Sequence, residues 1–566
     1  MRPLFCSMTG AAAPVPRGHL DGHGIFTIVV FAVVSTLCIF PCYIPLPKRI
    51  SQWLRLRAWR LRRAAGLAPA RKEAEPSSDS INTEKNDEFI LVPLTHVSAP
   101  ILGVLLLLMT RSIDGQQVRD GIAGESGVFP YDILLLFLSL AYIAISLDAT
   151  GLLRYLACHI CKRAYFDGRV LYIGMYFFLW LAGVILGNDP VILSGTAFLV
   201  YITRTAGISP PDAWLWSQFV AANVASAVLV SSNPTNLVIA TGFGLSFVKY
   251  TAYMVLPSFV SAVVALTVLM LYFGLRQPKD EKAAEAHTPS YGYIPKQILN
   301  PDIDPKSLLV DPSGAIFTTA VMLAVIGVLI GTSAIGDVKV FQIGVPGAAL
   351  CLIRDVCADL YRRAKHTSSE SDLDRFDGRF GWIGRLWRTM KHTFPTTLQT
   401  LRRLPLELLP FAFGMFILVQ ALDHVGFVTI MAKGVAVVCR HGVGATVFFM
   451  AILSIILCNF GGTNIGSTIL LTKVMQSPAF LQGLPNNKDL IVKAGMYSVA
   501  YGSNLGALGG TFAASLAGLL WLTILSHHGI HITRWQFALW CAVAVLPAVG
   551  AGLGVLLIQL LYFKGI

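Results

Sequence analysis

The chain has 566 residues, of which 55% are hydrophobic and only 13% are charged, and its mean hydropathy is +0.65. A soluble protein of this length would carry about a quarter charged residues, so the composition excludes a chain of ordinary soluble domains. The formal net charge of +13 would also suit a nucleic-acid ligand, but the basic residues crowd into two loops between apolar runs. That pattern is typical of the cytosolic face of a membrane protein, so we expect an integral, multi-pass protein in a lipid bilayer and no nucleic-acid partner.

The first apolar run, residues 25–44, follows an N-terminal tail, residues 1–24. A basic stretch follows the run, with no small-residue cleavage site, and this predicts an uncleaved membrane helix whose C-terminal end is cytosolic. Length and apolar content predict further simple spans at 91–109, 131–147, 250–273, 315–335, 340–353 and 535–563.

Three long polar loops separate the spans, at 46–88, 276–312 and 354–404. The first and third are strongly basic, while the second mixes both signs of charge and is predicted to link two halves. We count an even number of crossings between the two basic loops, which places them on one side, as the positive-inside rule requires. All three loops are therefore predicted to be cytosolic, in either a plasma membrane or an organellar membrane.

Polar, helix-breaking residues interrupt two apolar stretches of the first half. Residues 169–203 contain Gly187-Asn188-Asp189-Pro190, which leaves a second apolar arm of 13 residues. Such an arm spans about 20 Å as a helix, too short for a hydrocarbon core of about 30 Å, so we predict a re-entrant helical hairpin. Residues 214–247 contain Ser231-Ser232-Asn233-Pro234-Thr235-Asn236, which predicts a membrane helix with an unwound centre.

The second half repeats both features. A polar run from Asn459 to Asn464 interrupts a predicted hairpin at about 443–473, and a glycine-rich run from Tyr501 to Thr511 interrupts a predicted broken helix at about 490–525. Six chemically matching pairs, Pro130/Pro405, Asp132/Glu407, Leu147/Leu422, Asp148/Asp423, Gly151/Gly426 and Gly187/Gly462, share one offset of 275. We also match Ser232-Asn233 with Ser503-Asn504, at an offset of 271.

These matches predict an internal duplication, with repeat 1 at 25–275, the linker at 276–312 and repeat 2 at 313–566. Each repeat has five predicted crossings, an odd number, so the two repeats should be inverted relative to each other. The predicted fold is therefore an all-α membrane protein of two inverted repeats, each with a re-entrant hairpin and a broken helix. Such repeats with discontinuous helices are typical of secondary transporters.

The chemistry of the interruptions suits a small ion. Asn, Ser, Thr and freed carbonyls supply neutral oxygens to a cation, while half-helix N-termini direct amide dipoles at an anion. The predicted substrate and ion ligands are Asn188, Asp189, Ser232, Asn233, Thr235, Asn236, Thr463, Asn464, Ser503 and Asn504. Sodium, if it is the coupling ion, is expected near Asn188, Asn233, Thr463 and Asn504; no catalytic residue, other metal or organic cofactor is expected.

Asp189 has two interpretations. A carboxylate at membrane depth is costly to bury and is typical of proton or cation handling, which is the interpretation we favour. The alternative is a structural cap on the half-helix that begins at Pro190.

Four segments resemble the ion transporter superfamily, which includes arsenite permeases, sodium–proton antiporters and sodium-coupled citrate and dicarboxylate carriers. They are Gly187-Asn188-Asp189, Ser232-Asn233-Pro234-Thr235-Asn236-Leu237, Gly462-Thr463-Asn464 and Gly502-Ser503-Asn504-Leu505-Gly506. The resemblance covers roughly residues 25–565 and is closest to the arsenical-permease, citrate-transporter-like branch. The dicarboxylate branch carries Ser-Asn-Thr at its hairpin tips, from which this chain departs. The resemblance implies a homodimer with a scaffold part and a moving part that carries the site.

We therefore expect a secondary active transporter of a small anionic solute, of the arsenite/oxyanion or carboxylate class, coupled to protons or sodium. Its site would lie at opposed hairpin tips and unwound helices. The alternative within transport is a sodium–proton antiporter. The alternatives outside transport are a membrane receptor, which would need a large loop domain, and a membrane-embedded enzyme on a transporter scaffold, which would need a set of catalytic residues. The loops are only about 35 to 50 residues long, and no nucleophile elbow or paired carboxylates are evident, so we expect no enzyme.

Overall fold

The computed structural model describes residues 20–47, 49–53, 56–57, 91–124, 128–164, 167–276, 292–299, 304–332, 340–365 and 382–562. Within them almost all regular structure is helical, and eight helical segments are long and apolar enough to cross a membrane. These are Gly22–Ile39, Pro130–Ala149, Gly168–Leu186, Phe247–Gly274, Pro312–Thr332, Pro395–His424, Val443–Phe460 and Arg534–Tyr562. The predicted all-α, multi-pass membrane architecture is confirmed.

The elements of the first half, in chain order, are α1 (Gly22–Ile39), β1 (Cys42–Pro45), β2 (Leu91–Leu94), α3 (Ser98–Met109), α4 (Gly115–Ala123), α5 (Pro130–Ala149), α6 (Leu152–Arg163), α7 (Gly168–Leu186), α8 (Asn188–Thr205), α9 (Asp212–Ala225), the 3₁₀ turn η2 (Val230–Ser232), α10 (Pro234–Gly242) and α11 (Phe247–Gly274). Those of the second half are α13 (Pro305–Leu308), α14 (Pro312–Thr332), α15 (Phe341–Lys365), α16 (Trp382–Thr393), α17 (Pro395–Arg403), α18 (Leu408–His424), α19 (Phe427–Cys439), α20 (Val443–Phe460), α21 (Thr463–Gln476), α22 (Pro478–Gln482), α23 (Lys488–Gly506), the 3₁₀ turn η5 (Phe512–Ala514), α24 (Leu516–His527) and α25 (Arg534–Tyr562).

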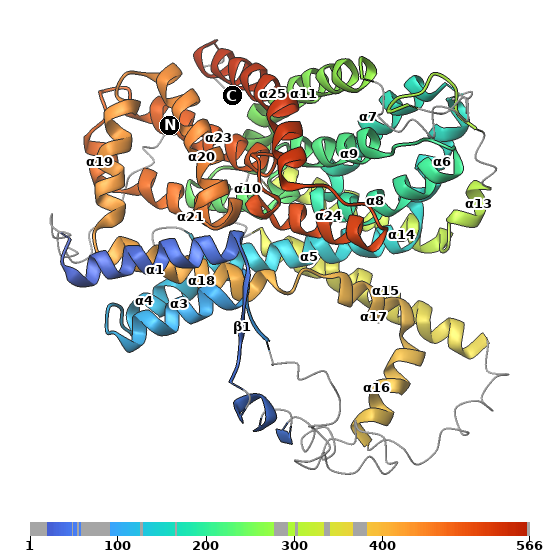
Figure 1. Ribbon diagram of the computed structural model, residues 1–566, viewed down its shortest axis with the longest axis horizontal. Coiled ribbons are helices and arrows are strands. Elements are labelled where there is room, and N and C mark those ends of the chain that lie inside the picture. The colour runs from blue at the N-terminus through green and yellow to red at the C-terminus, as the bar shows by residue number, and fades with distance from the viewer. Residues whose placement is uncertain are drawn as a thin grey trace.

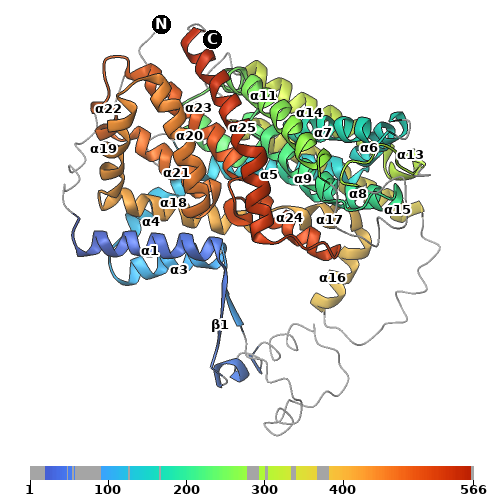
Figure 2. The same ribbon diagram turned by 45° about the horizontal axis from the view of Figure 1, so that its top comes forward.

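The first two predicted spans differ from their expected form. Helix α1 ends at Ile39, because Pro41 disfavours helical geometry in the residue before it, and the chain continues as strand β1. Strand β1 pairs antiparallel with β2, with Cys42 opposite Leu94. The predicted span 91–109 is therefore a strand followed by a 12-residue helix, α3. The two strands project away from the helices (Figure 1, Figure 2).

The predicted loop 354–404 contains helices in the part that the structure describes. Helix α15 continues to Lys365 because Asp355 and Asp359, one turn apart, lie buried and bonded to neighbouring helices. Helices α16 and α17 then cover residues 382–403. Part of the charge that indicated a solvated loop thus belongs to a packed network.

Three helix starts of the first half recur at the offset of 275 on which the predicted duplication rests. Helices α6, α7 and α8 begin at Leu152, Gly168 and Asn188, and α19, α20 and α21 begin 275 residues later, at Phe427, Val443 and Thr463. Gly151 and Gly426 share the left-handed conformation, with φ of 87° and 82°, and Gly187 and Gly462 share a positive φ, of 87° and 84°, but differ in ψ. Side chains with a Cβ rarely adopt this conformation, so the duplication preserves glycine where a helix must start sharply.

The predicted match of Ser232-Asn233 with Ser503-Asn504 is wrong. Asn233 caps α10 after η2, and the residue in the same place after η5 is Ser515, which caps α24 at an offset of 282. Asn504 lies inside α23, two residues before its end, as Asn223 lies two residues before the end of α9. The counterpart of Asn504 is therefore Asn223, at an offset of 281.

The two halves exchange their opening helices. Helices α1, α3 and α4 of the first half pack on α18 of the second, whereas α14, α15 and α17 of the second half pack on α5 of the first (Figure 1). The last long helices of the two halves, α11 and α25, pack along each other. Aromatic rings also join the two halves: Trp216 and Phe219 on α9 contact Trp521 on α24 and Phe537 on α25, with centroids 4.7–5.8 Å apart.

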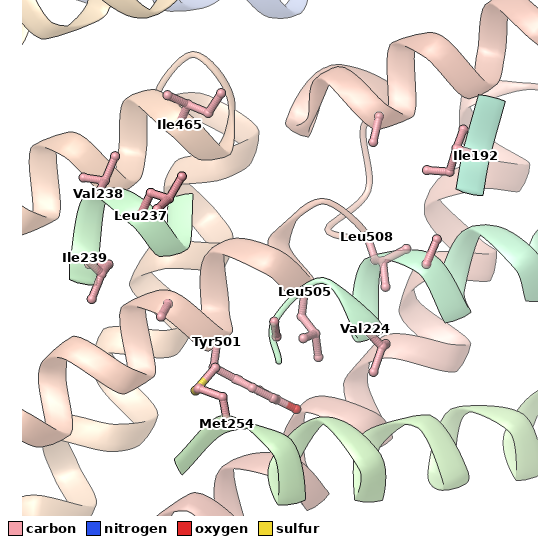
Figure 3. Close-up of a cluster of buried hydrophobic side chains, with 14 of the residues drawn as sticks. Ile192, Val224, Leu237, Val238, Ile239, Met254, Ile465, Tyr501, Leu505 and Leu508 are labelled. Atoms are coloured by element: carbon pink, nitrogen blue, oxygen red, sulfur yellow. The ribbon is translucent and has the colours of Figure 1, made fainter. Parts of the chain in front are cut away.

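Apolar side chains from both halves surround the helix breaks. Ile192 on α8, Val224 on α9 and Leu237 on α10 are buried, as are Ile465 on α21 and Leu505 on α23 (Figure 3). Such surroundings offer no hydrogen bonds, so the polar groups of the breaks must bond one another or a ligand.

Candidate functional site

The first hairpin tip is the turn from α7 into α8, at Gly187 to Pro190. A Cβ at Gly187 would lie 2.8 Å from the Ser232 carbonyl oxygen, so the tip approaches the unwound segment too closely for any other residue. No side chain caps the N-terminus of α8, which leaves the first-turn N–H dipoles directed at whatever lies in front of the tip. Asn188 is buried and donates from Nδ2 to Oδ1 of Asn223, at 3.3 Å.

Asp189 is the second residue of α8 and is half-buried. Its carboxylate forms no hydrogen bond or ion pair with any residue of the described chain. The alternative interpretation, a cap on the N-terminus of α8, does not match this geometry, because that helix has no side-chain cap. The carboxylate instead lines a cavity.

The unwound segment between α9 and α10 satisfies its own backbone. Asn233 is extended and caps α10, since its Oδ1 accepts the Thr235 N–H at 3.1 Å and the Thr235 hydroxyl at 3.0 Å. Asn236 donates to the carbonyls of Ser226, which caps the end of α9, and of Leu229, at 2.7 and 2.8 Å. Ser232 donates to the Val184 carbonyl at 2.6 Å and so ties the segment to α7.

Asn504 joins the halves at this segment. It is fully buried, and its Oδ1 accepts from Ser226 Oγ at 2.7 Å and from Asn233 Nδ2 at 3.0 Å. Its Nδ2 donates to Asn236 Oδ1 at 2.7 Å. Ser226 Oγ also bonds the Asn223 carbonyl, so a continuous amide network runs from the first tip to α23. Residues of the two halves, 268 to 278 positions apart, thus meet as the sequence predicted.

The second hairpin tip is built like the first but has different partners. Gly462 and Thr463 both have positive φ, 84° and 91°, and no side chain caps α21. Thr463 is fully buried, and its Oγ1 has no hydrogen-bond partner among the described residues. Asn464 is also buried, and its carbonyl accepts from the Ser467 and Thr468 hydroxyls of its own helix. No described hydrogen bond connects this tip to Asn188, and Ser503 bonds within α23.

The network contains two side chains that the sequence analysis missed, Asn223 and Ser226. Both lie at the end of α9, where no glycine or proline marks a break. The signal that could have found them is the offset of 281, which pairs Asn223 with Asn504.

The central cavity, of about 620 Å³, lies in front of the first tip. Asn188, Asp189, Ser231 and Ser232 line one side; Ser231 Oγ is buried without a partner in the described chain. The lining also includes the basic residues Arg402 and Arg403, which end α17, and His96 and Glu407, whose side chains lie 3.6 Å apart. Within a mostly apolar lining, the cavity thus brings together unpaired oxygens, the N-terminus of α8 and two guanidinium groups. Neither Thr463 nor Asn464 lines it.

A bound cation would have to use neutral oxygens and Asp189. No group of three His, Cys, Asp or Glu side chains that could hold a metal ion occurs in the described ranges. The Oδ1 atoms of Asn233 and Asn504 each accept two hydrogen bonds already. Among the side-chain oxygens that accept no hydrogen bond from described residues, Ser231 Oγ and the Asp189 carboxylate line the cavity, whereas Thr463 Oγ1 lies at the second tip.

Comparison of the sequence with known proteins identifies a family and several relatives. The family model described as "Citrate transporter" matches residues 83–492. The arsenical pump membrane protein of Escherichia coli strain K12 is 22% identical over 430 residues, which cover 75% of this chain and 85% of that protein. The arsenical pump membrane protein of Yersinia enterocolitica is 23% identical over 431 residues, with the same coverage. The solved structure of Neisseria gonorrhoeae MtrF, described in its title as illuminating a class of antimetabolite efflux pumps, aligns over 96% of each chain with 12% identity and a TM-score of 0.48.

Proposed function

Because the chain belongs to the citrate transporter family, and is a multi-pass membrane transporter, we propose that it carries a small anionic solute by secondary active transport. The solute would be an oxyanion, such as arsenite or phosphate, or a small carboxylate, and the coupling ion a proton or sodium. The names of the relatives, which refer to citrate and to arsenical pumps, motivate both solute classes.

One observation supports the proposal most: an unpaired carboxylate, an uncapped helix N-terminus and two arginines line the same cavity. Helix amides and guanidinium groups stabilise an anion, whereas Asp189 can take up a proton or pair with a sodium ion. A solute and a coupling ion of opposite charge would then stabilise each other, which is the energetic requirement for coupled transport.

A sodium–proton antiporter is the second candidate. The lone carboxylate at the first tip favours it, because one such group can alternate between a proton and a cation. Arg402 and Arg403 in the lining of the central cavity favour the anion carrier, since they would repel a cation that moves without an anion.

The proposal includes the remaining architecture. Loops 46–88, 276–312 and 354–404 would face the cytosol, the repeats would be inverted, and the protein would be a homodimer. The cavity, which reaches the first tip and not the second, would be one of two access states related by movement of the hairpins.

Flux measurements in proteoliposomes test the proposal. Purified protein would be reconstituted, and uptake of labelled arsenite, phosphate, sulfate, citrate and sodium measured with an imposed proton gradient, with a sodium gradient and with neither. We expect gradient-driven accumulation of one anion class. Sodium flux driven by a proton gradient with no anion transported would instead establish the antiporter, and no flux of any solute would contradict both.

A further inference from the structure

A second cavity, of about 230 Å³, lies among α5, α6, α15, α17 and the residues that precede α14. Four arginines line it: Arg154, Arg354, Arg362 and Arg403. We call it the arginine cavity. Guanidinium groups gathered in one cavity are costly unless anions neutralise them, and the chain's own carboxylates form ion pairs with three of the four, all but Arg154.

The carboxylates in this cavity are already occupied by the chain's own donors. Asp311 accepts from Arg354 at 2.6 Å, from Arg362 at 2.7 Å and from the Gly314 N–H at 2.9 Å. Asp355 accepts from Tyr142 at 3.0 Å, from Ser146 at 2.8 Å and from Arg354 at 3.3 Å.

The guanidinium groups, by contrast, keep most of their donors. Each has about five N–H donors, and the four together make only six hydrogen bonds to described residues. Arg154 makes none of these, and its Nε is buried without a partner in the described chain. A buried charged donor that lacks an acceptor is destabilising, so the geometry favours an acceptor from outside the chain.

We propose that the arginine cavity binds an anion with several oxygens, namely a phosphate-type group. Guanidinium groups match such oxyanions with paired, parallel hydrogen bonds. The volume holds several groups of water size, each about 30 Å³, which suits a tetrahedral oxyanion. The hydroxyl of Thr396, also in the lining, accepts from Arg362 and keeps its own O–H as a further donor. The same chemistry is offered by free phosphate and by an anionic lipid headgroup.

The cavity has a structural link to the transport site. Arg403 lines both cavities and pairs with Asp148 at 3.2 Å. Asp148 in turn accepts a hydrogen bond from Ser194 on α8, the helix that carries the first tip. An anion in the arginine cavity would therefore compete with Asp148 for a guanidinium group that faces the solute.

Arg154→Gln is the test variant, because Arg154 makes no hydrogen bond or ion pair within the described chain. Its charge also attracts the carboxylate of Asp148, which keeps its ion pair with Arg403 in the variant. Arg163→Gln is the matched control: it lies on the same helix, is exposed and removes the same charge. The purified full-length proteins would be melted with increasing inorganic phosphate at constant ionic strength. In a second arm they would be melted in phosphatidylcholine nanodiscs with and without phosphatidylinositol 4-phosphate.

We expect the Tm of the wild type and of Arg163→Gln to rise saturably with the anion, as mass action requires. The dissociation constant should be about tenfold weaker in Arg154→Gln, and its Tm without anion should not be lower than that of the wild type. A response to phosphate in detergent identifies a free anion as ligand, and a response confined to the anionic nanodiscs identifies a headgroup. Equal responses of the wild type and Arg154→Gln, or no response in either arm, would overturn the proposal, whatever the transport assay shows.

Discussion

The amide network that joins the halves should be a major source of stability. Asn504→Ala removes a side chain that accepts hydrogen bonds from Ser226 and Asn233. The same side chain donates a hydrogen bond to Asn236. All four residues are buried, so the abandoned donors and acceptor have no water to bond. Asn236 would keep its two bonds to the carbonyls of Ser226 and Leu229. The variant therefore loses the three bonds that join the Asn504 side chain to Ser226, Asn233 and Asn236.

An interhelical side-chain hydrogen bond in a membrane protein contributes about 0.6 to 2 kcal/mol. Three lost bonds therefore predict a fall in the free energy of unfolding of about 2 to 6 kcal/mol. Denaturation of the purified variant in detergent would measure it, with Asn487→Ala as control, because Asn487 is exposed and caps nothing with its side chain. The control should change stability by less than about 0.5 kcal/mol. If Asn504→Ala proved as mild as the control, the network would not hold the halves together as we reason.

Three further predictions concern the tip, the orientation and a peripheral carboxylate. Gly187→Ala should cost about 1 to 3 kcal/mol, measured by the same denaturation, because φ is +87° and the new Cβ would lie 2.8 Å from a carbonyl oxygen; an unchanged stability would mean that the tip is not so constrained. After replacement of the exposed native cysteines, single cysteines introduced at Arg57 and Lys391 should react with an impermeant thiol reagent added on the cytosolic side. A single cysteine at Gln116 should react with the reagent added on the opposite side of the membrane. Labelling of the Arg57 and Lys391 positions from opposite sides would refute the orientation. Burial alone would raise the pKa of Asp311, but the hydrogen bonds from the Gly314 N–H and from Arg354 outweigh burial and lower that pKa. The ionised Asp311 therefore stabilises the folded protein above the unfolded value of about 3.9, and this stabilisation is lost as the pH falls through the lowered pKa. Asp311→Asn should therefore flatten the fall of Tm below about pH 3.9, and an unaltered slope would contradict this.

Much of the fold could be predicted because its signals are strong. A long apolar run leaves few alternatives to a membrane helix, and a polar break within such a run leaves few alternatives to an interrupted one. The offset of 275 located the start of α8 and of α21. The strand pair could not be predicted, since four apolar residues beside a longer apolar run look like part of a membrane helix. The helices of 354–403 were hidden for the opposite reason: their charges resemble those of a solvated loop, although Asp355 and Asp359 are buried.

The candidate site was predictable where the backbone breaks and not elsewhere. Of the residues expected to converge, Asn233 and Asn504 are joined directly and Asn188 is joined to Asn223, whereas Thr463 Oγ1 has no partner among the described residues. Asn223 sits in an unbroken helical turn, so only its partners reveal it. Arg403 reaches the central cavity from a segment far along the chain, and only the packing of α17 on α5 brings it there.

Coupled transport through Asp189 is the central claim, and the flux of Asp189→Asn against pH and sodium concentration tests it most directly. The amide keeps the size of the side chain but removes its titratable charge, and Asp489→Asn, on an exposed first turn of α23, is the matched control. With equal amounts of reconstituted protein, we predict that Asp189→Asn loses proton- or sodium-driven accumulation and retains solute exchange, while the control behaves as the wild type. A pH profile and sodium dependence in Asp189→Asn that equal those of the wild type would contradict the account.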